Sequence, residues 1–123
     1  MYPSDRHYSK EHEWISVSGM TARVGITDYA QEQLGDVVFV ELPEVGQSFD
    51  QGAQFGSVES VKAVSDLYCP MAGKVVEVNT TLVDRPETVN ADPHGVWMIA
   101  IELTSPDQAA GLIDATAYAE LVS

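Results

Sequence analysis

The residues best placed to do chemistry surround one lysine near the middle of the chain. The segment from Glu59 to Asp66, ESVKAVSD, is nearly a palindrome centred between Lys62 and Ala63. Because mirrored residues face one another in an antiparallel hairpin, this symmetry predicts two paired strands joined by a Lys62–Ala63 turn. Two-residue hairpins prefer Asn-Gly or Gly-X, whereas Lys-Ala suits only the less favoured type I geometry. The turn is therefore explained if it presents an amine to solvent; an ordinary surface lysine is the alternative that the spacing leaves open.

Other chemistry has little support in the sequence. The three histidines, His7, His12 and His94, lack the close ligand spacing of a zinc site, so we expect no metal. A Schiff-base enzyme would need a lysine that loses its proton easily, through burial or a neighbouring cation. Acids flank Lys62 instead, and they favour its protonated form. Neither a Ser-His-Asp set nor a glycine-rich phosphate loop is apparent. The residues alone therefore disfavour each of these kinds of enzyme chemistry.

Short strands are expected to position this hairpin. Residues 13–18 and 21–26 are β-type runs joined by a glycine turn, and residues 36–42 are β-branched and aromatic in character. Between them, Thr27 or Asp28 can cap a short helix that stops at a glycine. From residue 46 to about 103, short apolar runs alternate with Gly, Pro and Asn, which is typical of a compact all-β unit.

The pattern becomes helical after about residue 105. Ser105-Pro106-Asp107-Gln108 predicts a helix start with a capping box, and Asp114 can cap a second short helix. Ala117, Tyr118 and Leu121 are spaced to share one face of that helix. We therefore expect a single domain over residues 1–123, with a β core at about 10–103 and a helical segment at about 105–121.

The charge balance restricts the partners. With 19 acidic residues against six Lys and Arg, the net charge is −13, which disfavours nucleic acid and anionic membranes. Such a surface suits partners with basic docking faces, and the alternative is that the acidity serves solubility alone. No apolar run is long enough to span a membrane, and the first residues do not resemble a leader, so we expect a cytoplasmic protein or a mature chain. The single cysteine, Cys69, lies in an apolar context and is expected to be structural.

Several long motifs resemble those of glycine cleavage H proteins. Phe55–Tyr68 is similar to the lipoylation-site signature of that family, and Gly25–Pro43 is similar to a second family motif. Shorter matches occur at Glu11–Trp14, Gly73–Asn79 and Trp97–Ile99. The resemblance runs in order from about residue 7 to 121. It implies the mainly β barrel-sandwich hybrid of lipoyl and biotinyl carriers, with short peripheral helices that include C-terminal ones.

The resemblance also implies a site. Lys62 corresponds to the lysine that carries lipoate in an amide bond, and Glu59, three positions before it, is associated with lipoylation. Gly46 and Gly73 stand sixteen positions before and eleven after the lysine, as the wider carrier family has them. Such glycines would permit turn geometry that a Cβ would obstruct. Biotin is disfavoured, because biotinylated hairpins usually have methionine on both sides of the lysine.

The implied function is that of a non-catalytic carrier in glycine catabolism and one-carbon metabolism. Lipoyl-Lys62 would take the aminomethyl group from glycine decarboxylase to the aminomethyltransferase, and dihydrolipoamide dehydrogenase would reoxidise the arm. A lipoate ligase or a lipoyl/octanoyl transferase would attach the group. Members of the family shelter the loaded arm in a cleft, for which Glu13 and Asp66 are the candidates.

Two segments depart from the family pattern. Residues 92–97 are one residue shorter than the usual loop, and residues 81–90 are atypical. These departures leave open an alternative function, in which the protein relays lipoyl groups to other carriers.

Overall fold

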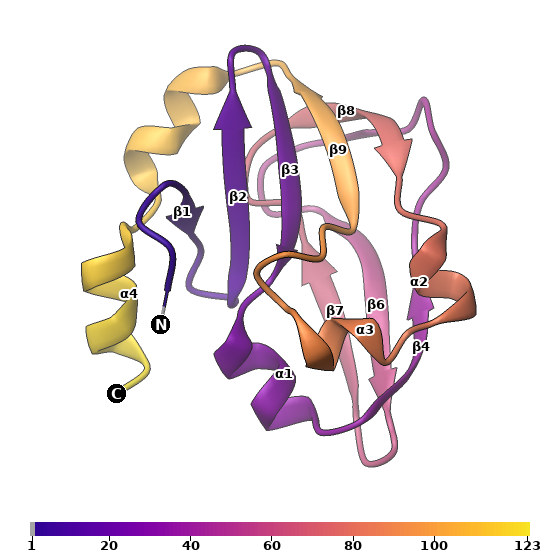
Figure 1. The fold of residues 1–123 in the computed structure, drawn as a ribbon. Helices are drawn as coiled ribbons and strands as arrows, with labels where there is room; N and C mark the ends of the chain where they lie inside the picture. The colour runs from indigo at the N-terminus through magenta and orange to yellow at the C-terminus, as the bar shows by residue number, and fades with distance from the viewer. Residues whose placement is uncertain (1) are drawn as a thin grey trace.

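The structure, a computed structural model, describes residues 2–123 and consists mainly of two antiparallel sheets with short helices outside them (Figure 1). One sheet has the strand order β1-β2-β3-β9-β8-β5 and the other β4-β6-β7. The strands are β1 (His7–Tyr8), β2 (Glu13–Ser18), β3 (Thr21–Ile26), β4 (Val37–Glu41), β5 (Ser48–Phe49), β6 (Gln54–Ser60), β7 (Val64–Tyr68), β8 (Gly73–Val78) and β9 (Ile99–Leu103). The helices are α1 (Asp28–Leu34), α2 (Thr81–Asp84), α3 (Thr88–Ala91), the 3₁₀ helix η1 (Pro106–Gly111) and α4 (Ala115–Leu121). This arrangement confirms the predicted fold class.

Apolar side chains from both sheets form the core between them. Val24 and Ile101, from the larger sheet, are fully buried, as is Val58 from the smaller one. Val58 alternates along β6 with a partly exposed and an exposed neighbour, because successive side chains in a strand point to opposite faces. A packed core of this kind makes the sheets a rigid base for the β6–β7 hairpin, which projects at the lower end in Figure 1.

Helix α1 follows the prediction from the sequence. The Thr27 hydroxyl caps it by accepting from the Ala30 N–H at 3.2 Å, and the helix ends at Gly35, whose φ is 81°. A left-handed residue of this kind is where a helix commonly stops. The helix therefore delivers the chain to β4 immediately beside the hairpin tip.

The C-terminal segment corrects one prediction. Ser105 makes no side-chain cap, and the expected α-helix is the 3₁₀ helix η1. The Gln108 side chain, expected in a capping box, instead accepts from the Ala72 N–H at 2.7 Å. Satisfying this backbone donor across 36 residues competes with local capping. The Asp114 cap is confirmed, since its carboxylate accepts from the Ala117 N–H at 2.8 Å.

Only part of the expected helix face in α4 is buried. Tyr118 is fully buried, whereas Leu121 is 52% exposed and Ala117 is exposed. The helix contacts the short strand β1, which is too small to cover a whole helical stripe.

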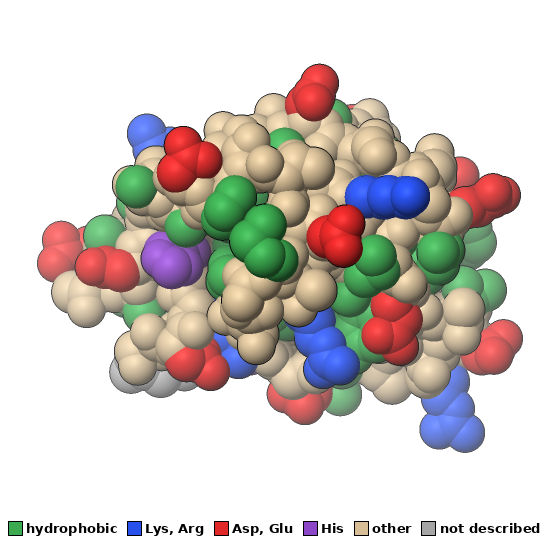
Figure 2. All heavy atoms as spheres, turned by 90° about the horizontal axis from the view of Figure 1, so that it is seen from above, with side chains coloured by type: hydrophobic (Ala, Val, Ile, Leu, Met, Phe, Trp, Pro, Cys, Tyr) green, Lys and Arg blue, Asp and Glu red, His purple; other side chains and the backbone are tan. Residues whose placement is uncertain are grey.

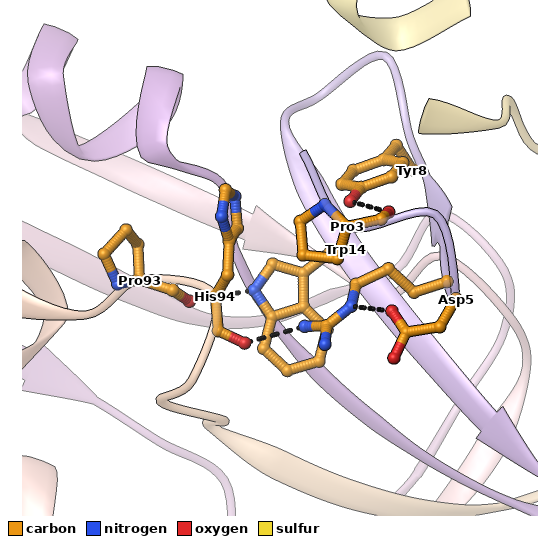
Figure 3. Close-up of polar contacts among 7 residues, drawn as sticks. Pro3, Asp5, Tyr8, Trp14, Pro93 and His94 are labelled. Carbon is orange, nitrogen blue, oxygen red and sulfur yellow. Dashed lines mark hydrogen bonds and ion pairs between the residues drawn. The ribbon is translucent and has the colours of Figure 1, made fainter. Parts of the chain in front are cut away.

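The shortened loop at residues 92–97 is held by the N-terminal segment and by Trp14 (Figure 3). The Trp14 indole N–H donates to the Pro93 carbonyl at 3.0 Å. Arg6 lies over the Trp14 ring, 4.5 Å from its centroid, and donates to the His94 carbonyl at 2.7 Å. These contacts fix the shortened loop against β2.

Acidic side chains are spread over the surface, as the face opposite the hairpin tip shows in Figure 2. None of the helices between residues 2 and 123 is long and apolar enough to cross a membrane. In the same range, no cluster of three or more His, Cys, Asp or Glu side chains is arranged to hold a metal ion.

Candidate functional site

Lys62 lies at the exposed tip of the β6–β7 hairpin, but the turn differs from the prediction. Glu59 pairs with Val64, and the Ser60 N–H donates to the Ala63 carbonyl at 2.8 Å. The two central residues of the turn are therefore Val61 and Lys62, and the expected Lys62–Ala63 turn is wrong by a shift of two residues in the pairing. Neither central residue has a positive φ, which agrees with the type I geometry expected for residues without glycine.

The Ser60 hydroxyl explains the observed register. Its oxygen accepts from the Ala63 N–H at 3.0 Å and from the Lys62 N–H at 3.3 Å. The serine side chain thus satisfies backbone donors inside the turn, as serine does in many turns. The palindrome did not predict this role, because in the pairing that it suggested Ser60 is a strand residue opposite Ser65.

The tip is also tied to the junction between α1 and β4. The Val61 N–H donates to the Asp36 carbonyl at 3.1 Å. The Lys62 stem lies beside Gly35, since a Cβ at that position would be 3.4 Å from the lysine Cε. Lys62 is consequently carried on an ordered turn whose base is fixed, and the residue is exposed.

Asn90, in the atypical segment 81–90, fixes the junction between α1 and β4 through hydrogen bonds. Its amide donates to the Gly35 carbonyl and to the Gln31 side chain, both at 2.9 Å, and its oxygen accepts from the Val37 N–H at 2.9 Å. A partly buried amide with three partners is well satisfied and fixes the position of the chain. Asn90 was not among the predicted site residues, because no local pattern indicates contacts with residues more than 50 positions away.

The two glycines expected in lipoylation recognition have different reasons to be glycine. Gly46 has a φ of 100° and open space around it, so its conformation alone selects glycine. Gly73 begins β8, where a Cβ would be 2.8 Å from the Glu102 carbonyl oxygen and close to Ile101. Gly73 therefore permits close strand approach and does not form a turn. Both lie away from the tip, and a recognition role for them stays a prediction.

The acids near the lysine are separated by the fold. Glu59 is exposed on β6, two residues before the turn centre, while Asp66 is exposed on β7 and accepts from the Gln54 side chain at 3.1 Å. Glu13 lies on β2 and is only 1% exposed. Of the three, Glu59 is the nearest in the chain to Lys62 and remains open to an incoming protein.

A groove of about 320 Å³ runs beside the hairpin, between the tip and α1. Its walls are mostly apolar, with polar groups from Glu11, His12, Gln33 and Ser65; the lining is Glu11, His12, Ile26, Tyr29, Ala30, Gln33, Leu34, Ala63, Val64, Ser65 and Leu67. Neither Glu13 nor Asp66 belongs to this lining. An arm-cleft role for those two acids stays a prediction, whereas Glu11 and His12 are the residues near Glu13 that line this groove.

The Glu13 carboxylate is used inside the protein. It accepts from the Ser9 hydroxyl at 2.5 Å and from the Tyr68 N–H at 3.1 Å, where β7 ends. Burial raises the pKa of Glu13 to about 7, although these two hydrogen bonds oppose the rise. Its position joins β2 to the end of β7, so it fixes the two sheets relative to one another.

Glu13 should make folding stability depend on pH. The pKa of Glu13 in the folded protein, about 7, lies above its ordinary value of 4.5. The contribution of Glu13 to the free energy of unfolding is therefore full below pH 4.5 and is lost as the pH rises through 7. Between pH 4 and pH 8 we expect titration of Glu13 to lower the free energy of unfolding of the wild type by about 2–3 kcal/mol, and we expect this decrease to be absent in Glu13→Gln. Urea unfolding of both proteins across this range measures the difference, and other titrating groups cancel because both proteins contain them. Parallel stability curves would contradict the assignment.

Cys69 behaves as the sequence predicted. It is 1% exposed, its Sγ donates to the Met71 carbonyl at 3.0 Å, and burial raises its pKa to about 11. A buried thiol with a raised pKa is a poor nucleophile. Cys69 is therefore a structural residue and not a reactive one.

Two facing antiparallel sheets with a lysine at the apex of a hairpin define a carrier protein of the barrel-sandwich class. The sequence profile described as "Glycine cleavage H-protein" matches residues 6–123. The chain belongs to the glycine cleavage H-protein family, whose members are the lipoyl carriers of the glycine cleavage system.

Individual relatives agree. A glycine cleavage system H protein of Symbiobacterium thermophilum is 62% identical over 117 residues, covering 94% of this chain and 91% of the relative. One of Acidobacterium capsulatum is 54% identical over 121 residues, covering 98% and 94%. The crystal structure of a glycine cleavage system H protein from Mycobacterium marinum matches with a TM-score of 0.90 and 44% identity, covering 98% of each chain.

Proposed function

We propose that Lys62 carries lipoate in an amide bond and that the protein transports an aminomethyl group between the enzymes of the glycine cleavage system. The observation that carries this proposal is the position of Lys62, exposed at the centre of an ordered turn in a member of this family. Acylation removes one positive charge, so the net charge of −13 becomes −14. The lipoyl group supplies disulfide and thiol chemistry when attached, while the chain supplies its position.

The residues around the tip fit such a group. The turn is fixed at Ser60 and Asp36, so an enzyme that modifies Lys62 meets one defined backbone geometry. The apolar groove starts at Ala63, the next residue, and could receive a flexible apolar chain attached at the lysine. Glu59 stays exposed beside the tip, where the modifying enzyme could recognise it.

The proposed cycle has three partner enzymes, and a fourth enzyme prepares the carrier for it. Glycine decarboxylase loads the arm, the aminomethyltransferase unloads it, dihydrolipoamide dehydrogenase reoxidises it, and a lipoate ligase or a lipoyl/octanoyl transferase attaches the lipoyl group. Tethering raises the local concentration of the arm at each partner site. The acidic surface favours partners with basic docking faces, whose association should weaken as salt increases.

Two measurements test the proposal. Intact mass before and after incubation with lipoate, ATP and a lipoate ligase should show one added lipoyl group. The modified protein should then support exchange of labelled bicarbonate into glycine when glycine decarboxylase is present, and the unmodified protein should not. A protein that gains no mass contradicts the carrier role. A protein that gains mass, passes lipoyl groups to other carriers and supports no exchange would be a lipoyl-relay protein instead.

A further inference from the structure

His12 stands out among the groove residues because of its backbone. Its φ is 71°, and among the described residues it is the only non-glycine residue with a positive φ. Such a conformation is unfavourable for an L-residue and persists only when the surroundings enforce it. Here the His12 N–H donates to the Ser9 carbonyl and the His12 carbonyl accepts from the Thr27 N–H, both at 3.1 Å. The strained backbone directs the imidazole into the groove between α1 and the hairpin.

A chain of hydrogen bonds leads from α1 through the C-terminal helix to this imidazole. The Ala30 N–H donates to the Thr27 hydroxyl oxygen at 3.2 Å. The Thr27 and Tyr118 hydroxyl oxygens are 2.7 Å apart, and the Tyr118 hydroxyl is 2.8 Å from His12 Nδ1. Thr27 and Tyr118 are both fully buried, so the chain is shielded from water.

Buried hydroxyl protons need acceptors, and this requirement sets the direction of the chain. If Thr27 donates to Tyr118 and Tyr118 donates to His12 Nδ1, both hydroxyl protons are satisfied. In the opposite direction, His12 would donate to Tyr118 and Tyr118 to Thr27. The Thr27 proton would then have no acceptor among residues 2–123, a costly arrangement in a fully buried group.

We propose that Tyr118 holds His12 as the tautomer protonated at Nε2, and that this N–H is the hydrogen-bond donor that the groove offers to the amine carried on the Lys62 arm. With Nδ1 occupied by Tyr118, only Nε2 can serve a group in the groove. Burial lowers the pKa of His12, against the effect of Glu11, so the ring is neutral near neutral pH. The inference rests on the proposed function and adds a positioning role for the C-terminal helix.

The donor has a definite chemical consequence for a carried aminomethyl group. Such a group is lost when the nitrogen lone pair forms a C=N bond, the C–S bond breaks and its electron pair remains on sulfur as thiolate. The resulting iminium ion is then hydrolysed by water to formaldehyde and ammonium. A hydrogen bond from His12 Nε2–H to the nitrogen occupies that lone pair and slows this loss. Glu11, on the same wall of the groove, is available to accept from the amine's own N–H.

The first test uses the unmodified protein and ¹⁵N NMR of the imidazole. Wild-type His12 should show a protonated Nε2 and an unprotonated Nδ1, and Tyr118→Phe should release the ring into a mixture of tautomers. Tyr8→Phe is the matched control, because Tyr8 is equally buried and stacks on Tyr118 with centroids 4.9 Å apart, yet its hydroxyl donates to the Pro3 carbonyl. It should leave the His12 signals unchanged. A protonated Nδ1 in the wild type, or a tautomer unaffected by Tyr118→Phe, would overturn the proposal.

The second test uses the lipoylated protein with its arm reduced and then loaded chemically. A thiol, formaldehyde and ammonia give the aminomethyl thioether and one water, so no partner enzyme is needed. The reappearance of free thiol should be roughly threefold to tenfold faster in His12→Phe, the range expected for one lost hydrogen bond. His12→Asn should restore a slow rate, since asparagine keeps an N–H donor and tolerates positive φ.

Equal rates in His12→Phe and the wild type would overturn the assignment of the donor. The two levels of inference can fail separately. Absence of lipoylation in the wild type would refute the proposed function, whereas the NMR test on the unmodified protein would still decide the tautomer.

Discussion

Replacing Lys62 by arginine is expected to abolish lipoylation completely. The guanidinium keeps the positive charge and a similar length, but it is far less nucleophilic than an amine and cannot take the amide link. The variant should therefore fold normally and gain no mass with lipoate, ATP and a lipoate ligase. Lys10→Arg and Lys74→Arg are the matched controls, because both lysines are exposed like Lys62 but lie outside the hairpin. Mass gain in the Lys62 variant would show that another group is modified.

The structure also predicts that the position of the lysine matters as much as its presence. Lys62 is the second central residue of the turn, whereas the Ala63 carbonyl already accepts from the Ser60 N–H and begins the pairing of the two strands. Moving the amine by one residue, in the double substitution Lys62→Ala and Ala63→Lys, should reduce the lipoylation rate at least about tenfold, because a misplaced nucleophile loses the alignment that the reaction needs. An unchanged lipoylation rate would mean that the modifying enzyme recognises any exposed lysine and does not depend on the turn.

Replacing Gly56 by alanine is expected to cause the largest loss of stability among glycine substitutions. A Cβ at this position on β6 would overlap the backbone carbonyl oxygen of Glu41, on the neighbouring strand β4. A backbone carbonyl inside a sheet cannot move aside as a flexible side chain can, so the strands must separate locally. We expect a loss of about 3 kcal/mol in the free energy of unfolding, measured by urea denaturation.

A matched substitution separates this steric effect from the general cost of replacing glycine. Gly111 has open space around it and no positive φ, so Gly111→Ala should change stability by less than about 0.5 kcal/mol. Gly56 lies where the β6–β7 pairing shifts register, so Gly56→Ala should also displace the hairpin and slow lipoylation. If both variants were equally stable, the close approach of β4 and β6 would not be what requires glycine at position 56.

Local patterns in the sequence predicted most elements of the fold. The bounds of β2 and β3 match the predicted runs 13–18 and 21–26, and α1 has the expected cap at Thr27. These features depend on neighbouring residues, such as a hydroxyl followed by helix formers or alternation along a strand. The predicted capping box at Ser105 did not form, because the Gln108 side chain accepts instead from the distant Ala72 N–H.

The candidate site was predictable only in part. Resemblance to the family identified Lys62 and Glu59, and the structure places both at or near the tip. The partners that fix the tip were not predictable: Asn90 reaches Gly35 from 55 positions along the chain. The motif around Glu13 also did not reveal that its carboxylate is buried and accepts from the Tyr68 N–H.

The sequence by itself determined the β-rich class and the membership of the carrier family, and it indicated the lysine that we propose as the lipoylation site, because strand patterns and the lysine motif depend on adjacent residues. Only the tertiary structure decided how that lysine is held and what lies beside it. Ser60 sets the turn, Asp36 anchors it, and Tyr118 reaches His12 across 106 positions. Hydrogen bonds between such distant residues depend on where the folded sheets and helices bring them together, and no local pattern contains that information.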